Sequence, residues 1–600
     1  MRLDMAAGPM TRSYRIWLLV LVGGWLACAA PAVADEPYRV DFTGVTVPAL
    51  RDALKNASQL VALADRPPPS PAALRRRAQD DLPRLEAVLH AEGYWQARIA
   101  YRVDTTEHPA RVTVTVMPGP LFHLARVTFA LASGTPATLV AAQGAAAIGL
   151  APGGAARSEP VEAGNARIVA IYEQNGFPFA RVSDRHVVVD VATHTMSVSY
   201  TIDPGAPARF GATAVAGLRR VARDFVTRRI AWKEGAAFDE RAVETTRQDL
   251  VHSGLFSAVR ISHAAAPAAD GTVAMTIDVT EGPPRSVGAG VGYNTNLGLG
   301  ASTFWEDRNL FGEGEDLRFT AGAAQKQLGV GADFRRPDFL GRKIDLVANA
   351  GLLQESTPAY DSRRRRGYIG LEDLVHPPYT LGGGVSIERA YLAETTRDEN
   401  YLLIGLPFYL LRDTSNDLLN PTTGTRTTFT FTPYHGLLAN DLDFFSARLE
   451  ARAYHSLDQS GYAVLAGYAA VGTVVGTSLE DLPADKRLYA GGTGSVRGFA
   501  YQTAGPLDSS GTPIGGRSSL EFGTELRYRI TPTIGLVPFF DAGDVYAANL
   551  PDRIRLFYSA GLGLRYYTAI GPIRLDLAFP INKRASDSAF QVYISIGQAF

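Results

Sequence analysis

Apolar and polar side chains alternate through nearly the whole C-terminal half of the chain, from residue 284 to the end. The alternating segments are about 8–14 residues long, and Gly, Asn, Asp or Pro separates them. We count sixteen, from Val287–Tyr293 to a last segment that begins at Phe590. Strands in lipid must pair all their backbone groups, which only a closed barrel allows. The pattern predicts a membrane β-barrel of 16 antiparallel strands over residues 284–600.

The two faces of one predicted strand favour a barrel over a soluble β-sandwich. One face of Glu521–Ile530 is apolar: Phe522, Leu526, Tyr528 and Ile530. The other face carries the charged residues Glu521, Glu525, Arg527 and Arg529. A sandwich would also alternate, but a sixteen-strand closure leaves a polar lumen wide enough for charges. A helical membrane bundle is excluded, because no run after residue 35 approaches the roughly 20 apolar residues of a spanning helix.

The first 34 residues form a predicted secretory signal peptide. Arg12 and Arg15 precede the apolar stretch 16–30, and Ala32-Val33-Ala34 fits a cleavage site of small residues. An uncleaved inner-membrane anchor and a lipoprotein acylated at Cys28 are the alternatives. Because Cys28 is the only cysteine, the mature chain would form no disulfide and no thiolate metal site.

Charge and motifs argue against nucleic acid as a partner and against catalysis. The 59 Lys and Arg residues balance 60 Asp and Glu residues, so there is no basic excess for nucleic acid. The ten histidines are scattered, without the paired spacing of metal ligands. No P-loop is present, and the segment Gly494–Gly498 lacks the spacing of a nucleophile elbow. We predict no enzyme activity, no cofactor and no metal site.

Residues 37 to about 283 contain a threefold repeat of about 80 residues. Each unit reads strand–helix–helix–strand–strand, and a helix in each ends at a glycine: Gly93, Gly176 and Gly254. We place three α+β domains at 35–119, 120–205 and 206–283. Their short opening strands, such as Tyr38–Phe42 and Ala125–Phe129, offer exposed edges to an extended segment of a partner.

One predicted connection is unusually long. The link between the eleventh and twelfth strands runs from about Thr477 to Gly516. A loop of this length without secondary structure is usually functional. It contains several glycines around one arginine and one aromatic residue, in Val496-Arg497-Gly498-Phe499.

Several motifs, in chain order, resemble those of the outer-membrane assembly superfamily that includes BamA, TamA and the two-partner secretion transporters. They are Asn309–Gly314, Asn420–Gly424, Val496–Phe499, Phe539–Gly543, Gly571–Asp576 and the C-terminal strand. The three upstream units resemble POTRA domains, and their number resembles TamA most. The resemblance covers almost all of the mature chain.

The resemblance implies that the long loop folds back into the lumen, where its arginine meets acids on the wall. Arg497, flanked by Val496, Gly498 and Phe499, would then pair with Asp541 and Glu525. Glu521 lies on the same face and is the second choice for this pairing. Such a contact serves either as a structural lock that holds the loop or as a moving switch.

The first strand is a candidate for a lateral seam. Its glycines, Gly288, Gly290 and Gly292, would weaken pairing with the last strand. The last strand carries Phe590, Val592, Ile594, Ile596 and Phe600 on one face. A client strand could add to the opened edges. The alternative is that the glycines only relieve crowding where the barrel closes.

The resemblance implies a TamA-like function in the outer membrane of a Gram-negative bacterium, with the POTRA domains in the periplasm. The protein would insert or translocate outer-membrane and surface proteins such as autotransporters, in contact with outer-membrane lipid. Its partner would be a TamB-like protein anchored in the inner membrane. The rivals are a two-partner exporter, a BamA-like general insertase, a passive porin and an envelope tether. Arg363–Arg366 are expected at the rim of the third outer loop, facing either solvent or lipopolysaccharide phosphates.

Overall fold

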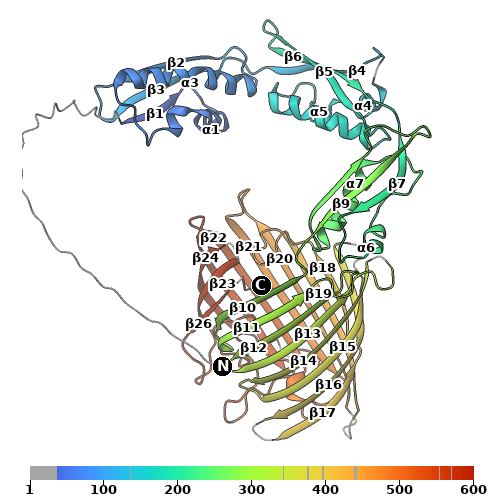
Figure 1. The fold of residues 1–600 in the computed structure, drawn as a ribbon. Helices are drawn as coiled ribbons and strands as arrows, with labels where there is room; N and C mark the ends of the chain where they lie inside the picture. Colours follow the sequence, from blue (N-terminus) through green and yellow to red (C-terminus); the bar gives the residue numbers. More distant parts are fainter. Residues whose placement is uncertain are drawn as a thin grey trace, which may run out of the picture. The chain divides into compact units, whose positions relative to one another are not determined.

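The computed structural model describes residues 37–600 except 136, 342, 374–376, 395–396, 438–441, 553, 569–570, 597 and 600. The predicted signal peptide and Phe600 therefore lie outside the described residues. The chain divides into two compact units, the first ending at Pro207 and the second running from Ala208 to Phe600. The first contains two α+β units, and the second contains a third α+β unit and a large β-barrel (Figure 1).

Each α+β unit is a three-stranded sheet covered by helices. The first has β1 (Tyr38–Thr43), α1 (Pro48–Ala57), α2 (Gln59–Ala62), α3 (Pro71–Ala91), β2 (Arg98–Asp104) and β3 (Ala110–Met117). The second has β4 (His123–Leu131), α4 (Thr138–Gln143), η1 (Ala145–Ile148), α5 (Ser158–Glu173), β5 (Arg181–Asp190) and β6 (Thr195–Asp203). The third has β7 (Arg209–Ala216), α6 (Arg223–Thr227), α7 (Glu240–His252), β8 (Phe256–His263) and β9 (Thr272–Glu281). The predicted order of elements is confirmed.

The closing strand of each unit lies in the middle of its sheet, parallel to the opening strand and antiparallel to the other. The sheet orders are β1-β3-β2, β4-β6-β5 and β7-β9-β8. Alternate residues of a central strand are buried, as Val112, Val114 and Val116 of β3 show. They pack against helix residues such as Leu85 and Leu89, so each unit has a core of its own. The opening strands β1, β4 and β7 therefore lie at sheet edges.

A glycine follows the opening strand in the first and third units, at equivalent positions. Gly44 has a φ of +83°, and a Cβ built on it would lie 2.1 Å from the carbonyl oxygen of Val116. Gly217 has a φ of +88°, and its Cβ would lie 1.9 Å from the carbonyl oxygen of Val279. The chain therefore passes so close to the central strand that only glycine fits.

The barrel is one antiparallel sheet of seventeen segments that occupy sixteen positions. The first eight are β10 (Arg285–Asn294), β11 (Gly298–Asp307), β12 (Asp316–Ala324), β13 (Gln327–Arg336), β14 (Ile344–Ser356), β15 (Asp361–Asp373), β16 (Tyr379–Ala393) and β17 (Asp398–Gly405). The others are β18 (Phe408–Asp413), β19 (Gly424–Gly436), β20 (Asp443–Ser456), β21 (Ala463–Val475), β22 (Ser518–Arg529), β23 (Ile534–Tyr546), β24 (Phe557–Thr568), β25 (Gly571–Pro580) and β26 (Gln591–Ile596).

The eighth position of the barrel is interrupted. Both β17 and β18 pair with β16 on one side and with β19 on the other, so together they form one strand. The break lies at Leu406-Pro407, where proline has no N–H to give to the ladder. Sixteen strands is therefore the correct count, as the sequence predicted.

The faces of the barrel wall differ in polarity. On β25, Ile573, Leu575 and Leu577 are exposed on the outside, whereas Arg574 and Asp576 are buried inside. The same alternation around the barrel gives an apolar outer wall and a polar lumen. Among the described residues, no helix has the length and apolar character that crossing a bilayer requires.

The barrel ends in a seam between its first and last strands. In the described residues, β10 pairs only with β11, and β26 pairs only with β25. The two strands lie side by side (Figure 1), and the hydroxyl of Thr295 donates to the carbonyl oxygen of Val592 at 3.1 Å. The seam therefore lacks the ladder of backbone hydrogen bonds that joins the other neighbours.

The third α+β unit is fastened to one end of the barrel. A buried ion pair joins Arg229 to Asp338, in the β13–β14 connection, at 2.5 Å. The backbone N–H of Ala222 donates to the carbonyl oxygen of Gly312 at 2.7 Å. On the unit's side of the junction, the carboxylate of Glu281 accepts hydrogen bonds from three consecutive backbone N–H groups, at 219–221. Burial opposes ionisation, but these bonds outweigh it and lower the pKa of Glu281.

The expected place of Arg363–Arg366 is wrong. These residues lie within β15 and not in a loop, because the connection between β14 and β15 spans only residues 357–360. Strand alternation sends Arg364 into the lumen and puts Arg363 and Arg365 on the outer wall.

Replacing Gly44 by alanine should destabilise the first α+β unit by at least about 3 kcal/mol, because the new methyl group meets a backbone carbonyl. Gly134 is the matched control: its φ is +84°, but no atom lies within 4 Å of the place that a Cβ would take. Gly134→Ala should therefore cost only the backbone strain, about 1–2 kcal/mol. Pulse proteolysis across a urea series measures both. Equal losses would contradict the close-approach explanation.

Candidate functional site

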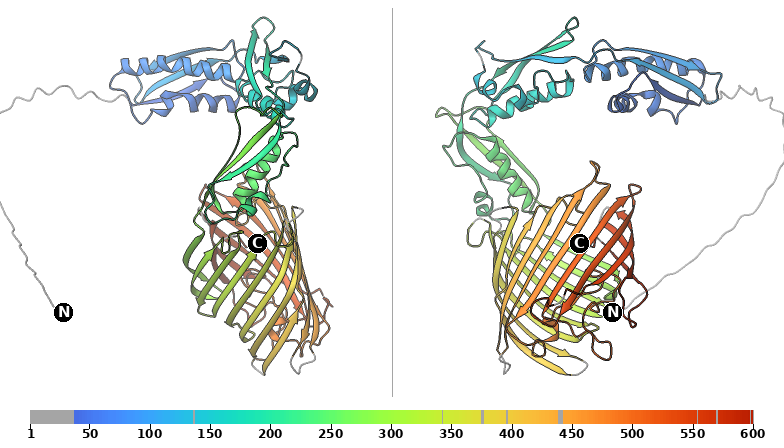
Figure 2. Two further views of the ribbon diagram at one scale, coloured as in Figure 1. Left: turned by 45° about the vertical axis from the view of Figure 1, so that its right-hand side comes forward. Right: turned by 180° about the vertical axis from the view of Figure 1, so that it is seen from behind.

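The long connection between β21 and β22, residues 476–517, is packed against the inside of the barrel. Several of its side chains are almost completely buried, including Leu482, Val496 and Phe499. Leu482 packs with residues of β16, β17, β20 and β21, whereas Val496 and Phe499 pack with Val545 of β23. Figure 2 shows the later strands, orange to red, on the side of the barrel opposite the green and yellow ones. The connection, which we call the lumen loop, therefore contacts widely separated parts of the wall.

Arg497 lies at the centre of the tightest contact between the lumen loop and the wall. Its Nε and Nη2 donate to the two carboxylate oxygens of Asp541 at 2.7 and 2.8 Å. Its Nη1 donates to Glu525 at 2.7 Å and to Asp576 at 3.1 Å. The side chain is only 1% exposed, and its guanidinium lies 3.6 Å from the centre of the Phe539 ring. A buried guanidinium is costly unless it is paired, and here three carboxylates pair it.

The three carboxylates come from three strands of the same wall. Glu525 lies on β22, Asp541 on β23 and Asp576 on β25. Each occupies an inward position, on the strand face opposite to exposed residues such as Leu526, Phe540 and Leu575. The fork of Arg497 grips Asp541 with two parallel bonds, which a lysine ammonium cannot do.

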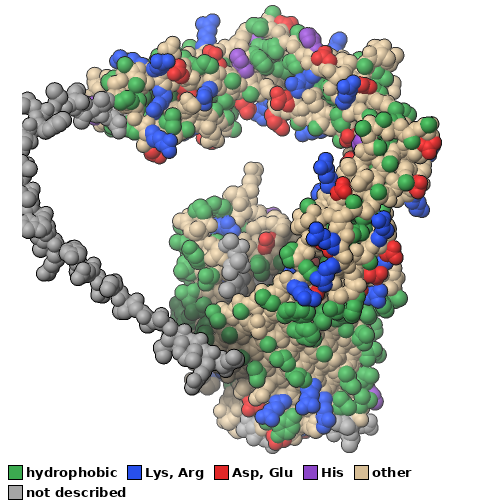
Figure 3. All heavy atoms as spheres, viewed as in Figure 1, with side chains coloured by type: hydrophobic (Ala, Val, Ile, Leu, Met, Phe, Trp, Pro, Cys, Tyr) green, Lys and Arg blue, Asp and Glu red, His purple; other side chains and the backbone are tan. Residues whose placement is uncertain are grey.

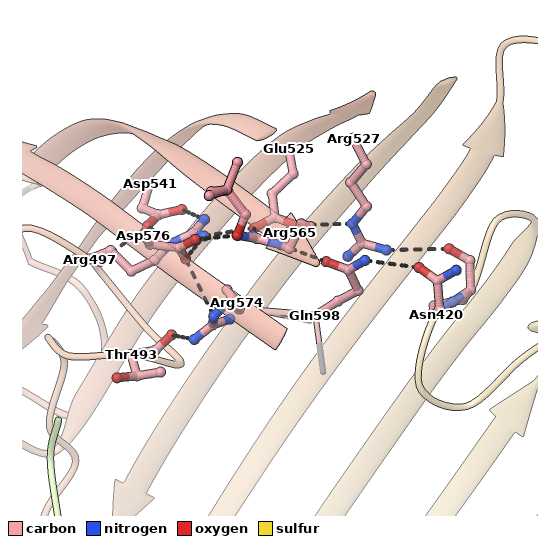
Figure 4. A network of polar contacts seen from close by, with 12 residues as sticks. Asn420, Thr493, Arg497, Glu525, Arg527, Asp541, Arg565, Arg574, Asp576 and Gln598 are labelled. Carbon is pink, nitrogen blue, oxygen red and sulfur yellow. Dashed lines mark hydrogen bonds and ion pairs between the residues drawn. The ribbon is translucent and has the colours of Figure 1, made fainter. Parts of the chain in front are cut away.

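Further polar contacts extend this cluster along the wall (Figure 4). Arg565 donates to Asp576 at 2.5 Å and to Gln598 at 3.0 Å, and Gln598 donates to Asn420 at 2.8 Å. Arg527 donates to Glu525 at 3.0 Å and to the carbonyl oxygen of Pro421. Arg574 contacts Asp576 and donates to the carbonyl oxygen of Thr493. The network thus joins the lumen loop, the C-terminal residues and the β18–β19 connection.

The backbone beside Arg497 is held by the last strand. Gly498 has a φ of +100°, and a Cβ there would lie 2.8 Å from Cβ of Ser559. The hydroxyl of Tyr593, on β26, accepts from the N–H of Gly498 at 3.2 Å and donates to the carbonyl oxygen of Phe499 at 2.9 Å. The ring of Phe499 packs edge-on against Phe557. The segment Val496–Phe499 is therefore fixed by bonds on both sides of the arginine.

Glu521, the second-choice partner of Arg497, contacts other residues. It accepts from the hydroxyl of Ser495 at 2.5 Å and from Arg448 at 3.0 Å. Glu525, four residues along the same strand, occupies the position beside Arg497. Glu521 thus holds the lumen loop through Ser495 rather than through the arginine.

A second anchor fixes the lumen loop to β15–β17. Asp485 accepts from the hydroxyl of Tyr401 at 2.6 Å and lies 3.5 Å from Nη1 of Arg364. The neighbouring Lys486 donates to Glu388, a buried carboxylate of β16. The sequence analysis did not identify this anchor, because Asp485 and Lys486 resemble an ordinary solvated pair in a loop.

Sequence reasoning also missed Asp576, Arg565 and Tyr593. Asp576 ends a motif that the resemblance singled out, but no role was given to it. The available signal was the strand alternation, which puts Asp576 and Arg565 on the inner face beside Glu525 and Asp541. The same alternation puts Tyr593 on the inner face, between the outward Val592 and Ile594, but a single aromatic side chain there carries no charge that would single it out.

The structure separates the seam glycines into two kinds. A Cβ on Gly288 would lie 2.3 Å from the ring of Phe304, so crowding explains this residue. The nearest atom to a Cβ on Gly290 would be 3.6 Å away, and on Gly292 nothing lies within 4 Å. On the last strand, Val592 and Ile594 are exposed on the outer wall, and Phe590 precedes β26. Crowding therefore does not account for Gly290 and Gly292.

The site holds the lumen loop through buried ion pairs. Its acids are paired with arginines, and in the described part of the chain no cluster of His, Cys, Asp or Glu could hold a metal ion. The fold and the site define a class of protein: a membrane β-barrel preceded by α+β units. Its lumen loop is held by buried ion pairs, and its first and last strands share no backbone ladder among the described residues.

Comparison with known proteins agrees with this class. Residues 309–600 match the Omp85 superfamily domain. The outer membrane protein assembly factor BamA of Nitratidesulfovibrio vulgaris is 26% identical over 449 residues, which cover 72% of this chain and 56% of that protein. BamA of Neisseria meningitidis serogroup B is 20% identical over 484 residues, covering 71% of this chain and 60% of that protein. The chain thus spans less than two thirds of the length of either relative.

A solved structure shares the fold. BamA from Haemophilus ducreyi lacking POTRA domains 1–3 has a TM-score of 0.66 and 20% sequence identity, covering 79% of this chain and 99% of that one. The chain therefore carries an Omp85 superfamily domain in residues 309–600. It is an outer-membrane β-barrel protein whose POTRA-like units lie in the periplasm.

Arg497→Lys should release the lumen loop while leaving the barrel inserted, because lysine keeps the charge but loses the paired bonds to Asp541. Breaking a buried pair costs about 3–5 kcal/mol, so protease should cut residues 476–517 in intact vesicles. Arg517→Lys is the control, since among the described residues the Arg517 side chain bonds carbonyl oxygens alone, those of Thr477 and Ala547. Full protection of the loop in Arg497→Lys would refute the lock.

Tyr593→Phe should loosen the contact between β26 and the lumen loop. It leaves the N–H of Gly498 without its partner, which costs about 1–3 kcal/mol, and the carbonyl oxygen of Phe499 keeps only its bond from the N–H of Gly492. The temperature at which the folded barrel loses its fast electrophoretic mobility measures the effect. Tyr566→Phe on the exposed outer wall is the control, and an equal shift in both variants would argue against this role.

Proposed function

We propose that this protein assembles or translocates other outer-membrane proteins by opening the seam between β10 and β26. The observation that carries the proposal is the missing backbone ladder at this seam, which leaves two strand edges with unpaired N–H and C=O groups among the described residues. Such edges are templates for strand addition. A client strand can therefore form on β10 while both remain in the membrane.

The lumen beside the seam has room for a client segment. A cavity of about 960 Å³ is lined by Gly290 and Gly292 of β10 and by Ser595 of β26, among others. The two glycines face it without side chains, and no neighbouring side chain fills the space beside Gly292. This open lining supports a role for the glycines in weakening the edge and admitting a client.

The lumen loop supports the last strand from inside. Tyr593 of β26 bonds the backbone around Arg497, and Gln598 reaches Arg565 of the same network. β26 is therefore the fixed side of the seam, and β10 is the side that moves. In this proposal, the contact of Arg497 with Asp541 and Glu525 is a structural lock that keeps the barrel shaped while the seam opens.

The finer proposal is a TamA-like module. The edge strands β1 and β4 of the periplasmic units can each accept an extended segment by backbone pairing. We propose that they receive a TamB-like partner anchored in the inner membrane, and that the clients include surface proteins such as autotransporters. The proposed function requires no covalent reaction and rests on binding and on strand exchange.

A BamA-like general insertase is the second candidate, favoured by the names of the two relatives above. A two-partner exporter would thread its client through the lumen, but the lumen loop is fixed at both Arg497 and Asp485. The same two anchors oppose a passive porin. Low, unsteady conductance in planar bilayers is expected, and a high, steady conductance would favour the porin.

Cross-linking the seam should stop client assembly. Thr295→Cys with Val592→Cys joins the two sides where the Thr295 hydroxyl lies 3.1 Å from the Val592 carbonyl oxygen. Oxidation should abolish assembly of a client barrel, and reduction should restore it. The control is Ala348→Cys with Ile369→Cys, which links the Cα partners of the β14–β15 hairpin. Unimpaired assembly with the seam closed would refute strand addition there.

Photo-crosslinking from β1 and β4 tests the partner. Probes at Arg39 and Thr128 lie on the edge strands, and mass spectrometry identifies what they capture. Capture of one very large, β-rich, inner-membrane-anchored protein supports the TamA-like module. Capture of a secreted repeat protein instead supports the exporter, and capture of periplasmic chaperones and lipoproteins supports the BamA-like insertase.

A further inference from the structure

The outer wall of the barrel carries three exposed arginines on β15 and β16. Strand alternation puts Arg363, Arg365 and Arg389 on the outward face that also carries Ile369 and Ile387. We call these three residues the arginine cluster. Figure 3 shows Lys and Arg side chains near the end of the barrel away from the third α+β unit, next to a broad wall without charges. In an outer-membrane protein with periplasmic α+β units, this end is extracellular.

The arginine cluster forms no salt bridge in the described part of the chain, although Asp361 lines the same groove. Arg365 and Arg389 are directly opposite each other on neighbouring strands, and like charges in that position destabilise a sheet. No described carboxylate forms a salt bridge with any of the three. The outward-facing acids Asp361 and Asp398 lie nearer the rim, and Asp398 already accepts from the hydroxyl of Tyr391 at 2.7 Å. Arg365 and Arg389 are therefore close together without a bonded carboxylate among the described residues.

Two grooves on the outer wall meet at Arg365 and Arg389. The one nearer the rim, of about 930 Å³, is lined by polar residues such as Gln354, Tyr391 and Asn400. The other, of about 830 Å³, extends toward the middle of the membrane. It is lined by apolar residues that include Val330, Ala332, Leu352, Ile387 and Leu402. The two arginines thus stand where a polar groove passes into an apolar one.

The position of the cluster matches the level of lipid headgroups. Leu352 lies opposite Arg365, and Ile387 precedes Arg389 by two residues on the same face, farther from the rim. The apolar band therefore begins at the cluster. An arginine on the lipid face costs about 2–4 kcal/mol at the midplane of the bilayer but about 0–1 near its surface. Guanidinium groups at the depth of the lipid headgroups contact the phosphates of those headgroups. They bind phosphates by paired, charge-assisted hydrogen bonds.

We propose that this surface is a binding site for a phosphorylated, multiply acylated lipid of the outer leaflet. A phosphate lies between Arg365 and Arg389 and relieves their repulsion, with Arg363 beside it. The acyl chains occupy the apolar groove that runs over Leu352 and Ile387. This site is separate from the seam and from the lumen loop, so it does not depend on the proposed assembly function.

Full-length protein in phosphatidylcholine nanodiscs tests the site. The probes are lipid A with its two phosphates, the same lipid after removal of the phosphates, and inorganic phosphate, and native mass spectrometry measures binding. Lipid A should bind at least about tenfold more tightly than its dephosphorylated form. The double variant Arg365→Gln with Arg389→Gln should lose this difference.

Two further variants separate the headgroup contact from the acyl groove and from general charge. Leu352→Trp fills the apolar groove and should weaken lipid A binding without changing the charge. Arg412→Gln removes an arginine at the periplasmic end of the wall, where it bonds Thr425 at 2.7 Å, and should leave lipid binding unchanged. Folding of each variant is checked by electrophoretic mobility before and after heating.

Three results would overturn the proposal. Equal binding of lipid A by the wild type and the double variant would exclude the arginine pair. Equal binding of the two lipid forms would exclude the phosphate contact. Full competition by millimolar inorganic phosphate, with no effect of Leu352→Trp, would identify the site as one for a free anion rather than a lipid.

Discussion

A positive charge inside the barrel organises much of what surrounds it. Arg497 is nearly excluded from solvent, so its guanidinium requires carboxylates at short distance, and Glu525, Asp541 and Asp576 supply them from three strands. Those acids in turn hold Arg565, Arg527 and Arg574, which bond the C-terminal residues, the β18–β19 connection and the lumen loop itself. Removing one member leaves its partners charged and buried. The network therefore behaves as one unit. Replacing any one of its charged residues destabilises the buried charges that remain.

Buried ion pairs hold the barrel wall around Arg497, whereas the described residues form no backbone ladder at the seam. These two regions lie close together in the strand order. β22 to β26 carry the arginine network or bond the lumen loop, whereas β10 contributes glycines to the wall and the described residues give it no backbone partner in β26. In the proposed function, this contrast lets one edge open while the rest of the barrel keeps its shape. Backbone groups exposed in lipid must find partners, so the same proposal places a client strand at the opened edge.

Much of this architecture follows from sequence pattern, and the exceptions have physical causes. Alternation at a period of two gives the sixteen strands and the inward acids, and the repeat gives three α+β units. Alternation cannot show that Pro407 splits the eighth strand, nor that Arg363 and Arg365 lie within a strand, because both depend on where turns form. The Asp485–Lys486 anchor was missed because the partners of charged residues in a loop cannot be predicted before the position of the loop is known. Tyr593 looked like a wall residue, although its hydroxyl faces the loop backbone.

The place of Tyr593 and Gln598 near the C-terminus has a consequence for biogenesis. The lumen loop is synthesised long before these residues, yet two of its backbone bonds and one end of its polar network need them. A chain that has inserted most of its strands still has an incomplete lock. The loop gains these last bonds only when the final strand is in position, so its contacts are complete only at the end of folding. Proteases and chaperones that sample the loop would thereby distinguish an unfinished barrel from a finished one.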